Sequence, residues 1–377
     1  MPTALLAGAF GQRNPGDDAL LDAFAAGLPG WDVVATVGAQ ALPIDGGPRV
    51  VPSAEPRRVA RMAATADAVI FGGGTVFKAL RQETGRPPLD LLRRALALAY
   101  GAKALGKPLA LVGVGAAPIA SREGRVLARR LVAQADLLVL RDEESADVLA
   151  AAGAETPFRV GADPAWTLLA EPPGDGGERR GPVIVALSHE AGGPGLADDL
   201  AAALVPLLAA QHPVSLQPWQ IGGAARPDDL DLARAINERL GGAAQLLLPP
   251  ADLLDARALF ADARLVVGLR FHALVAAAAA GTRFVAVAHE PKLAALARRL
   301  GQPAVSLEGG ALDPGGLTAA MLAALCDGAP PRPAAVRGEI ARSEQSLCLL
   351  RLLLGGGRPE DADTIGTLPL APLAWSS

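Results

Sequence analysis

The stretch that decides the expected fold is LVVGLRFHALVAAAAA, residues 265–280. Its first three residues end a short apolar run that is typical of a buried parallel strand. Gly268 interrupts this run, and Arg270 and His272 follow at once, before a helix of small residues. The order strand, tight turn, Arg-x-His, helix places a cation and an imidazole at the carboxyl end of a strand, where open α/β sheets bind ligands. The amino end of a helix favours an anionic ligand.

Strand patterns and helical patterns alternate along the rest of the chain. Strands are expected at 3–10, 32–37, 49–51, 67–72, 108–113, 135–140, 183–188, 213–217, 245–248 and 283–287. Helices are expected at 19–27, 59–65, 89–105, 123–133, 195–211, 228–240, 253–261 and 335–354, with another that ends at Leu300. This alternation predicts an α/β protein with two Rossmann-like parallel-sheet domains facing a cleft.

A length of 377 residues also favours two domains over one. The segment EPPGDGGERRGP, rich in Pro, Gly and charge, is the clearest linker. We therefore expect a first domain at 1–170, the linker at 171–182 and a second domain at 183–330. A C-terminal helix at 331–357 is expected to pack back on the first domain, and residues 358–377 are expected to form a loosely held tail.

Composition narrows the possible functions. A net charge of −4 and an aromatic content of 3% argue against nucleic-acid binding. Cys326 and Cys348 are expected to be buried free thiols, and with four scattered histidines they cannot build a metal site. The N-terminus lacks a basic region and a long apolar core, and the apolar residues 89–99 are too few to span a bilayer, so a cytoplasmic location is expected.

A glycine-rich loop, GQRNPGDD at 11–18, joins the first strand to the first helix. It has neither the GxGxxG spacing of a dinucleotide site nor the GK[ST] of a Walker A loop. Asp17 and Asp18 stand where the helix is expected to begin. They can be simple caps, which Asp favours there, or one of them can orient or deprotonate a hydroxyl group.

Two other strands end in groups that suit a ligand. Three consecutive glycines, Gly72–Gly74, let a backbone approach a ligand closely or expose several N–H groups to it, whereas a plain turn needs one glycine. Arg141 directly follows a strand, with a helix opening behind it, as Arg270 does. The simpler alternative is that Arg141 pairs with Asp142 or Glu144.

The expected cleft would bring together Arg141 from the first domain with Arg270 and Lys292 from the second. Three cations and several helix amino ends can hold a small ligand with two anionic groups, since an arginine fork suits carboxylate and phosphate. His272 can give a proton near neutral pH. A metal is not required by this set of side chains.

Two other histidines are weaker candidates. His189 follows the strand at 183–188, and His289 precedes Lys292. Either one could line the cleft, or both could be structural.

Together these motifs resemble the polysaccharide pyruvyl transferase family, over about residues 5–300. The matching motifs, in chain order, are Asn14-Pro15-Gly16-Asp17, Gly72-Gly73-Gly74, Arg141-Asp142-Glu143-Glu144-Ser145, Asp163-Pro164-Ala165, Arg270-Phe271-His272 and Pro291-Lys292. The Arg-x-His step is the most specific of these motifs.

The resemblance implies a two-domain fold similar to that of the GT-B glycosyltransferases. It implies transfer of the enolpyruvyl carbons of phosphoenolpyruvate to two hydroxyls of a sugar, which gives a cyclic ketal and phosphate without a cofactor. The chain looks like the branch that modifies a lipid-linked cell-wall glycan and anchors S-layers, which acts in the cytoplasm or at the inner face of the membrane. The acceptor there contains N-acetylmannosamine.

The residues divide into three expected roles. The catalytic residues are His272, Asp17 and Asp18. The phosphoenolpyruvate-binding residues are Arg141, Arg270, Phe271, His272 and Lys292. The acceptor-binding residues are Asn14, Gly16, Asp17, Gly73 and Gly74.

The chain also departs from the family pattern. Lys78 stands near the place of an acid that usually follows the glycine triplet, and Asp18 replaces a frequent Glu. Both departures concern the acceptor contacts more than the donor contacts. The main alternative is a GT-B glycosyltransferase with a nucleotide-sugar donor, because the same fold and the same Arg and Lys residues could hold its diphosphate, although the second domain lacks an obvious acid for a ribose. A non-catalytic binding protein of the same fold is a second alternative.

Overall fold

The computed structural model describes the whole chain except residues 39–47, 81–84, 170–178, 223–227, 308–309 and 358–377. Its contacts divide it into two compact units. The first unit contains Met1–Gln12, Asp17–Leu168 and Glu339–Ser377. The second contains Arg13–Gly16 and Leu169–Gly338.

The first unit is built on a parallel sheet with the strand order β3-β2-β1-β4-β6-β7-β8, and β5 pairs with β6. Its strands are β1 (Thr3–Phe10), β2 (Asp32–Val37), β3 (Arg49–Pro52), β4 (Ala68–Gly72), β5 (Thr75–Phe77), β6 (Leu109–Ala116), β7 (Leu137–Leu140) and β8 (Arg159–Val160). Every pairing is parallel.

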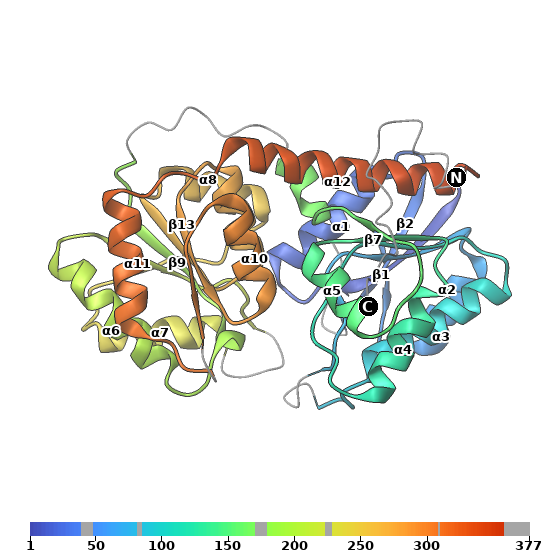
Figure 1. Cartoon of the computed structure of the whole chain (residues 1–377), viewed down its shortest axis with the longest axis horizontal. Helices are drawn as coiled ribbons and strands as arrows, with labels where there is room; N and C mark the ends of the chain where they lie inside the picture. Colours follow the sequence, from blue (N-terminus) through green and yellow to red (C-terminus); the bar gives the residue numbers. More distant parts are fainter. Residues whose placement is uncertain (39–47, 81–84, 170–178, 223–227, 308–309, 358–377) are drawn as a thin grey trace. The chain divides into compact units, whose positions relative to one another are not determined.

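Helices cover both faces of this sheet (Figure 1). On one face, alternate strand residues pack against α2 (Pro56–Thr65), α3 (Asp90–Ala104), α4 (Arg122–Val132) and α5 (Glu143–Ala151). On the other face lie α1 (Pro15–Gly27) and the part of α12 (Pro333–Leu354) that belongs to this unit. Arg351 Nη1 in α12 donates to the carbonyl of Gly27 at 3.1 Å, which joins these two helices.

The second unit has a parallel sheet with the strand order β11-β10-β9-β12-β13-β14. Its strands are β9 (Val183–Ala186), β10 (Val214–Gln217), β11 (Gln245–Leu246), β12 (Leu265–Gly268), β13 (Phe284–Ala288) and β14 (Ala304–Ser306). This order, in which the chain first adds strands on one side and then on the other, is that of a Rossmann fold.

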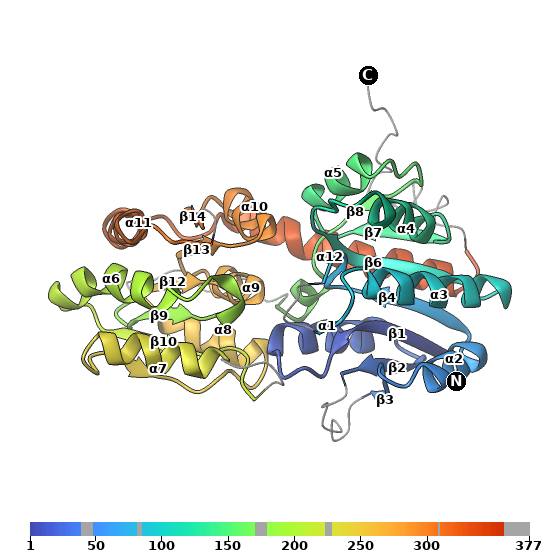
Figure 2. The same ribbon diagram turned by 90° about the horizontal axis from the view of Figure 1, so that it is seen from below.

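Two helix layers enclose the second sheet as well (Figure 2). One face packs against α6 (Leu196–Ala209), α7 (Asp229–Arg239) and α11 (Pro314–Cys326). The other face carries α8 (Leu253–Asp262), α9 (Phe271–Ala279) and α10 (Pro291–Leu300). Helix α9 is buried along its whole length, because its small residues let it lie close to the strands beneath.

The predicted α/β fold with parallel sheets is confirmed, and most predicted elements lie within a few residues of the observed ones. Several boundaries differ. Helix α1 begins at Pro15 and not at residue 19, because Pro is well suited to the first position of a helix. Strand β6 continues to Ala116, beyond the predicted end at 113. The short strands β5 and β14 and the helix α11 were not predicted.

The two cysteines differ from the expectation in their exposure. Cys326 and Cys348 are free, but Cys326 is exposed and Cys348 only half-buried, so the prediction of buried thiols was wrong. Cys326 is the last residue of α11 and lies away from that helix's buried side. The expected tail and most of the expected linker lie outside the described residues.

The end of the expected linker is held by the second unit. Arg179 Nη2 donates to the carbonyl of Ala280 at 2.6 Å, and Nη1 donates to the carbonyl of Ala261 at 2.5 Å and contacts the Thr282 hydroxyl. Partial burial lowers the pKa of this guanidinium. Arg179 is thus an anchor of the described chain.

In the part of the chain that the structure describes, no helix combines the length and the apolar character needed to cross a membrane.

Candidate functional site

Most of the predicted site residues follow the strands on either side of the point where each strand order reverses, whereas Arg141 follows β7 and Lys292 follows β13. In the first sheet this point lies between β1, which leads into α1, and β4, which leads into the glycine triplet. In the second sheet it lies between β9, which leads to His189, and β12, which leads to Arg270 and His272. Ligands of open α/β sheets bind at such switch points, outside the carboxyl ends of the strands.

Asn14 caps helix α1. Its Oδ1 accepts the backbone N–H of Gly16 at 3.2 Å, as the side chain of a residue before a helix commonly does. The same oxygen accepts a hydrogen bond from Trp219 Nε1 at 3.2 Å. Asn14 and Trp219 both belong to the second unit. Asn14 thus supplies a side-chain cap of the kind that was one of the two alternatives for Asp17 and Asp18.

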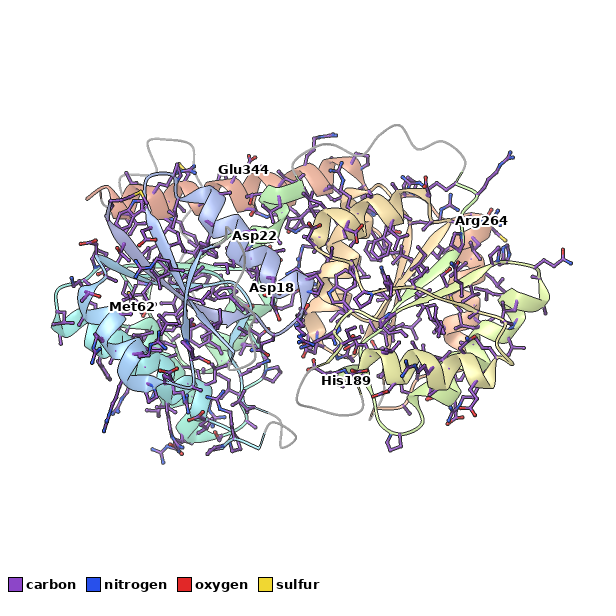
Figure 3. The ribbon with its side chains drawn as sticks, turned by 180° about the vertical axis from the view of Figure 1, so that it is seen from behind. Asp18, Asp22, Met62, His189, Arg264 and Glu344 are labelled. Carbon is purple, nitrogen blue, oxygen red and sulfur yellow. The ribbon has the colours of Figure 1, made fainter. Side chains whose placement is uncertain are left out.

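Asp17 and Asp18 lie within the first turn of α1. Asp18 Oδ1 accepts the backbone N–H of Gly11 at 2.7 Å, which closes the loop after β1. Burial raises the pKa of Asp18 to about 6; the Gly11 bond opposes this shift, and the charges of Asp17 and Asp22 add to it. Figure 3 shows Asp18 and Asp22 on α1. Asp18 is thus a carboxyl group that can exchange a proton near pH 6.

The glycine triplet is required by the fold of the first unit. Gly73 and Gly74 have φ of +65° and +67°, a region that side chains disfavour. A Cβ on Gly72 would lie 2.4 Å from Leu6, and one on Gly73 would lie 2.6 Å from Leu20 of α1. The Gly73 N–H donates to the carbonyl of Val112 at 2.9 Å. Close packing accounts for Gly72 and Gly73, and a positive φ accounts for Gly74, where a Cβ would meet nothing within 4 Å. A role of these glycines in acceptor binding stays a prediction.

Arg141 forms the ion pair that was the simpler alternative. Its Nε donates to Asp142 Oδ2 at 2.8 Å, its Nη1 lies 3.9 Å from Asp163 Oδ2, and only 4% of its side chain is exposed. Burial opposes the ionisation of Asp142, but the charge of Arg141 and hydrogen bonds from Ser145 and Arg141 hold its pKa below the ordinary value. Contact of Arg141 with phosphoenolpyruvate stays a prediction.

Arg270 is the cation at the switch point of the second sheet. It stands directly before α9, is 8% exposed, and its Nε donates to the carbonyl of Leu187 at 3.4 Å. Its Nη2 donates to both carboxylate oxygens of Asp229, at 3.0 and 2.9 Å. A second acid, Glu190, lies 3.5 Å from Nη1. Arg270 is therefore oriented by acids before any ligand arrives.

Asp229 is the site residue that the sequence prediction missed. Asp229 is completely buried at the start of α7. Its Oδ1 accepts the backbone N–H of His189 at 2.8 Å and contacts the ring Nδ1 of His189 at 2.6 Å. Its Oδ2 accepts the N–H groups of Trp219 and Gln220 at 3.2 and 2.8 Å. Burial would raise its pKa, but the bonds from His189, the charge of Arg270 and the backbone N–H groups hold the pKa of Asp229 below its usual value.

His272 lies in the first turn of α9 with 8% of its surface exposed. Gly16 approaches its ring so closely that a Cβ there would lie 2.3 Å from Nδ1. The ring of Phe271 meets the His272 ring edge-on, with centroids 5.4 Å apart. The structure therefore brings the predicted residues Gly16, Phe271 and His272 together within the second unit.

Lys292 lies in the first turn of α10 and pairs with Glu290 at 2.5 Å. His289 contacts the carbonyl of Leu269 through Nε2 at 3.0 Å, so it connects the end of β13 to the end of β12. These contacts give His289 a structural part.

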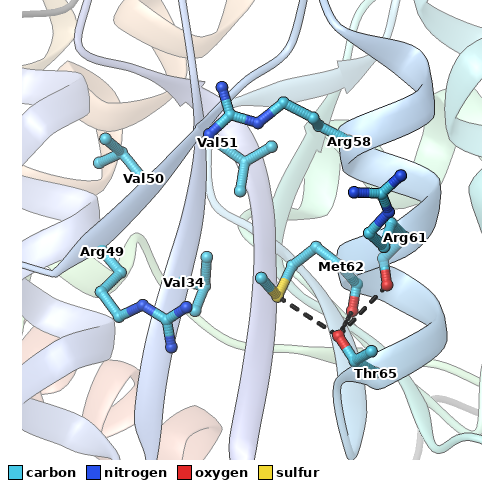
Figure 4. A pocket seen from close by; sticks show the side chains of 8 residues that line it. All are labelled: Val34, Arg49, Val50, Val51, Arg58, Arg61, Met62 and Thr65. Atoms are coloured by element: carbon cyan, nitrogen blue, oxygen red, sulfur yellow. Dashed lines mark hydrogen bonds between the residues drawn. The ribbon is translucent and has the colours of Figure 1, made fainter.

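A separate pocket of about 230 Å³ lies in the first unit between β3 and α2 (Figure 4). Three arginines line it, two of which pair with acids: Arg49 with Asp32 at 2.7 Å and Arg58 with Glu55 at 3.3 Å. None of the predicted site residues lines this pocket. Among the described residues, no group of three or more His, Cys, Asp or Glu side chains could hold a metal ion.

Solved structures support the fold. The chain aligns with MnaA of S. aureus in a co-structure with UDP at a TM-score of 0.62 and 12% identity, covering 94% of this chain and 97% of that one. It aligns with UDP-GlcNAc 2-epimerase from Neisseria meningitidis bound to UDP-GlcNAc at 0.63 and 10%, covering 94% and 100%. For Anabaena HepE in complex with UDP the values are 0.57 and 15%, covering 97% and 99%. These are GT-B-type folds.

A comparison with curated proteins finds no match. The family model of polysaccharide pyruvyl transferases matches residues 14–291, which run from the capping Asn14 to the start of α10. This span is well over half of the chain and includes the residues at both switch points. The chain therefore belongs to the polysaccharide pyruvyl transferase family.

Proposed function

We propose that this protein transfers the enolpyruvyl carbons of phosphoenolpyruvate to two hydroxyls of a sugar in a surface-polysaccharide precursor, forming a pyruvate ketal and releasing phosphate. Family membership supports the transfer of a pyruvyl group. The observation that carries the proposal is the pair Arg270 and His272 at the amino end of α9, at the switch point of the second sheet. A cation, a proton donor and a helix amino end together suit a ligand that is both an anion and a proton acceptor.

The charges around Arg270 bear on how the donor is held. Phosphoenolpyruvate carries a carboxylate and a phosphate, while Asp229 already balances much of the charge of Arg270. We assign the remaining attraction to Lys292, Arg141 and the N–H groups at the start of α9, with Phe271 covering the donor. An arginine that is oriented in advance loses little side-chain entropy when it binds an anion.

The reaction needs two hydroxyl protons to be moved. His272 gives a proton to C3 of the enol, C2 becomes electrophilic, and the first sugar hydroxyl adds to C2 as its proton passes to Asp17 or Asp18. The bond between C2 and the phosphate oxygen then breaks, with its electron pair leaving on the phosphate. The second hydroxyl adds to C2 and loses its proton, so the two hydroxyl protons are balanced by one on C3 and one on phosphate.

The acceptor is assigned to the loop before α1 and to the glycine triplet, through Asn14, Gly16, Asp17, Gly73 and Gly74. Asp18 fits the role of the base, because a carboxyl group with a pKa of about 6 is mostly ionised at neutral pH yet holds a proton more firmly than an ordinary aspartate. We propose a lipid-linked cell-wall glycan as the acceptor, met in the cytoplasm at the inner face of the membrane, as in the S-layer-anchoring branch.

A nucleotide-sugar glycosyltransferase is the second candidate. The observation that favours it is the similarity in fold to proteins solved with UDP or UDP-GlcNAc. At 10–15% identity this similarity concerns the fold alone. The two candidates differ in the donor that they consume.

The product of the reaction tests the proposal. The purified protein is incubated with phosphoenolpyruvate and a panel of N-acetylmannosamine glycosides, and phosphate release and the acceptor mass are followed. Ketal formation at a 1:1 ratio with phosphate, abolished in His272→Ala, is expected. Transfer of a sugar from UDP-GlcNAc to the same acceptors, with no ketal from phosphoenolpyruvate, would contradict the proposal.

A further inference from the structure

The half-buried His189 and the fully buried Asp229 form a hydrogen-bonded pair outside the residues that the family motifs contain. His189 opens the short 3₁₀ turn that follows β9, and Asp229 opens α7. The backbone N–H and the ring Nδ1 of His189 both contact Asp229 Oδ1, at 2.8 and 2.6 Å. One bond fixes the backbone of His189 and the other orients its imidazole, and both end on the same oxygen.

The state of Asp229 decides which ring nitrogen carries the proton. Asp229 accepts hydrogen bonds from Arg270 and from two backbone N–H groups, and these groups stabilise its ionised form. An ionised carboxylate only accepts hydrogen bonds, so Nδ1 of His189 must be the donor. Among the described residues none makes a hydrogen bond to His189 Nε2, and 17% of the side chain is exposed. Nε2 is thus the nitrogen that can exchange a proton with a bound ligand.

The carboxylate of Asp229 also places this imidazole beside Arg270, the cation that we propose binds phosphoenolpyruvate. His189 Nδ1 and Arg270 Nη2 lie 2.6 and 3.0 Å from the same Asp229 oxygen. Among the described residues, the charged groups connected to this ring by ion pairs are Asp229 of α7, Arg270 before α9 and, through Arg270, Glu190 of the 3₁₀ turn. An anion held by Arg270 would therefore lie next to His189, and it would favour the protonated imidazole.

We propose that His189 is a second proton-transferring residue of this protein, oriented by Asp229. The inference rests on the pyruvyl-transfer function proposed above. With phosphoenolpyruvate bound, His189 carries protons on both nitrogens. As the bond between C2 and the phosphate oxygen breaks, Nε2 gives its proton to that oxygen. Neutral Nε2 then takes the proton of the second sugar hydroxyl as it adds to C2, which restores the protonated ring.

This role is separate from that of His272, which gives its proton to C3. His272 protonates C3, and His189 protonates the leaving phosphate. The division meets the proton balance of the reaction, because C3 and phosphate each gain one proton and the two hydroxyls each lose one. Histidines held by a buried carboxylate perform such acid and base steps in many enzymes.

The first test measures proton uptake when phosphoenolpyruvate binds, by calorimetry at pH 8 in two buffers with different heats of ionisation. The key variant is His189→Asn, because the Asn amide can keep a hydrogen bond to Asp229 but cannot titrate. His212→Asn is the matched control: this histidine precedes β10, at the amino edge of the same sheet, and contacts Arg264 at 3.1 Å. Figure 3 shows His189 and Arg264 far apart on the second unit.

The wild-type protein and His212→Asn are expected to take up part of a proton on binding, and His189→Asn is expected to lose this uptake while its Kd changes less than about tenfold. Equal uptake in all three proteins would overturn the inference and leave the proposed function intact. A wild-type protein that does not bind phosphoenolpyruvate at all would instead contradict the proposed function.

The second test measures turnover with an N-acetylmannosamine glycoside as acceptor. We expect kcat to fall about 10²- to 10⁴-fold in His189→Ala, the range typical of a lost proton-transfer group. Added imidazole should restore part of this activity, since it can enter the space left by the ring. A loss of activity that imidazole does not restore, together with a normal pH profile in His189→Asn, would show that His189 is structural.

Discussion

Arg270 donates through one nitrogen to both carboxylate oxygens of Asp229, and both side chains are buried. The two residues are 41 positions apart in the chain and meet because α7 follows β10 and α9 follows β12, the two strands that flank β9 in one sheet. Asp229 therefore orients Arg270, to which we assign the binding of phosphoenolpyruvate, and it also holds the ring of His189.

Removing the acid should destabilise the protein. Asp229→Asn leaves Arg270 charged in a buried place, and breaking a buried pair by neutralising one partner costs about 3–5 kcal/mol. Chemical denaturation measures the loss. The control is Asp252→Asn, because Asp252 is the exposed cap of α8 and Asn caps a helix as well as Asp does, so its cost should stay within about 1 kcal/mol. Equal losses in the two variants would refute the importance of the pair.

Replacing the cation by lysine should weaken donor binding. Arg270→Lys keeps the charge but loses the planar fork, so it cannot contact Asp229 and an anion at the same time. We expect about 10- to 100-fold weaker binding of phosphoenolpyruvate, since a charge-assisted hydrogen bond contributes about 1.5–3 kcal/mol. Arg264→Lys, at the amino end of β12, is the control and should bind normally. Unchanged affinity in Arg270→Lys would remove Arg270 from the donor site.

The stability of the protein should depend on pH through Asp18. Its pKa is about 6 in the folded protein and near 3.8 when the chain is unfolded, so the folded state holds this proton more tightly. Stability from this group is present below about pH 4 and is lost as the pH rises through about 6. Asp18→Asn should reduce the fall in the free energy of unfolding between pH 4 and pH 7. Identical slopes for the two proteins would mean that Asp18 does not titrate in this range.

A methyl group at Gly16 should disturb His272. In an open helical position Gly→Ala stabilises by up to about 1 kcal/mol, but a Cβ on Gly16 would lie 2.3 Å from the His272 ring. We expect Gly16→Ala to destabilise by about 1–3 kcal/mol and to lower turnover. Gly101→Ala in α3, where a Cβ meets nothing within 4 Å, should be neutral or stabilising. Thermal melting of both variants checks the sign, and a stabilised Gly16→Ala would contradict the contact.

The fold could be predicted from the sequence because its strands are continuous apolar runs. Residues 265–267 could be identified as a buried strand from their side chains alone, and the helix after them from its run of small residues. Arg270 and His272 could be placed at the carboxyl end of the sheet because they follow the strand directly. Elements without such a pattern were missed, including the three-residue strand β5 and helix α11, which opens with Pro-Gly-Gly.

Asp229 could not be recognised in the same way. In the sequence, Asp228 and Asp229 look like two equal acids before a helix, where Asp is common as a cap. The structure separates them, because Asp228 caps α7 while Asp229 turns inward to His189 and Arg270. Both partners are about 40 positions away in the chain, so no local pattern contains the pair. His189 was only a weaker candidate for the same reason.

The most direct test of the central claim is a calorimetric titration of the wild-type protein with phosphoenolpyruvate, beside UDP and UDP-GlcNAc, repeated with Arg270→Ala. We expect phosphoenolpyruvate to bind the wild-type protein, Arg270→Ala to remove this binding, and neither uridine nucleotide to bind comparably. Binding of UDP-GlcNAc with none of phosphoenolpyruvate would contradict the proposed pyruvyl transfer and assign the switch point of the second sheet to a nucleotide-sugar.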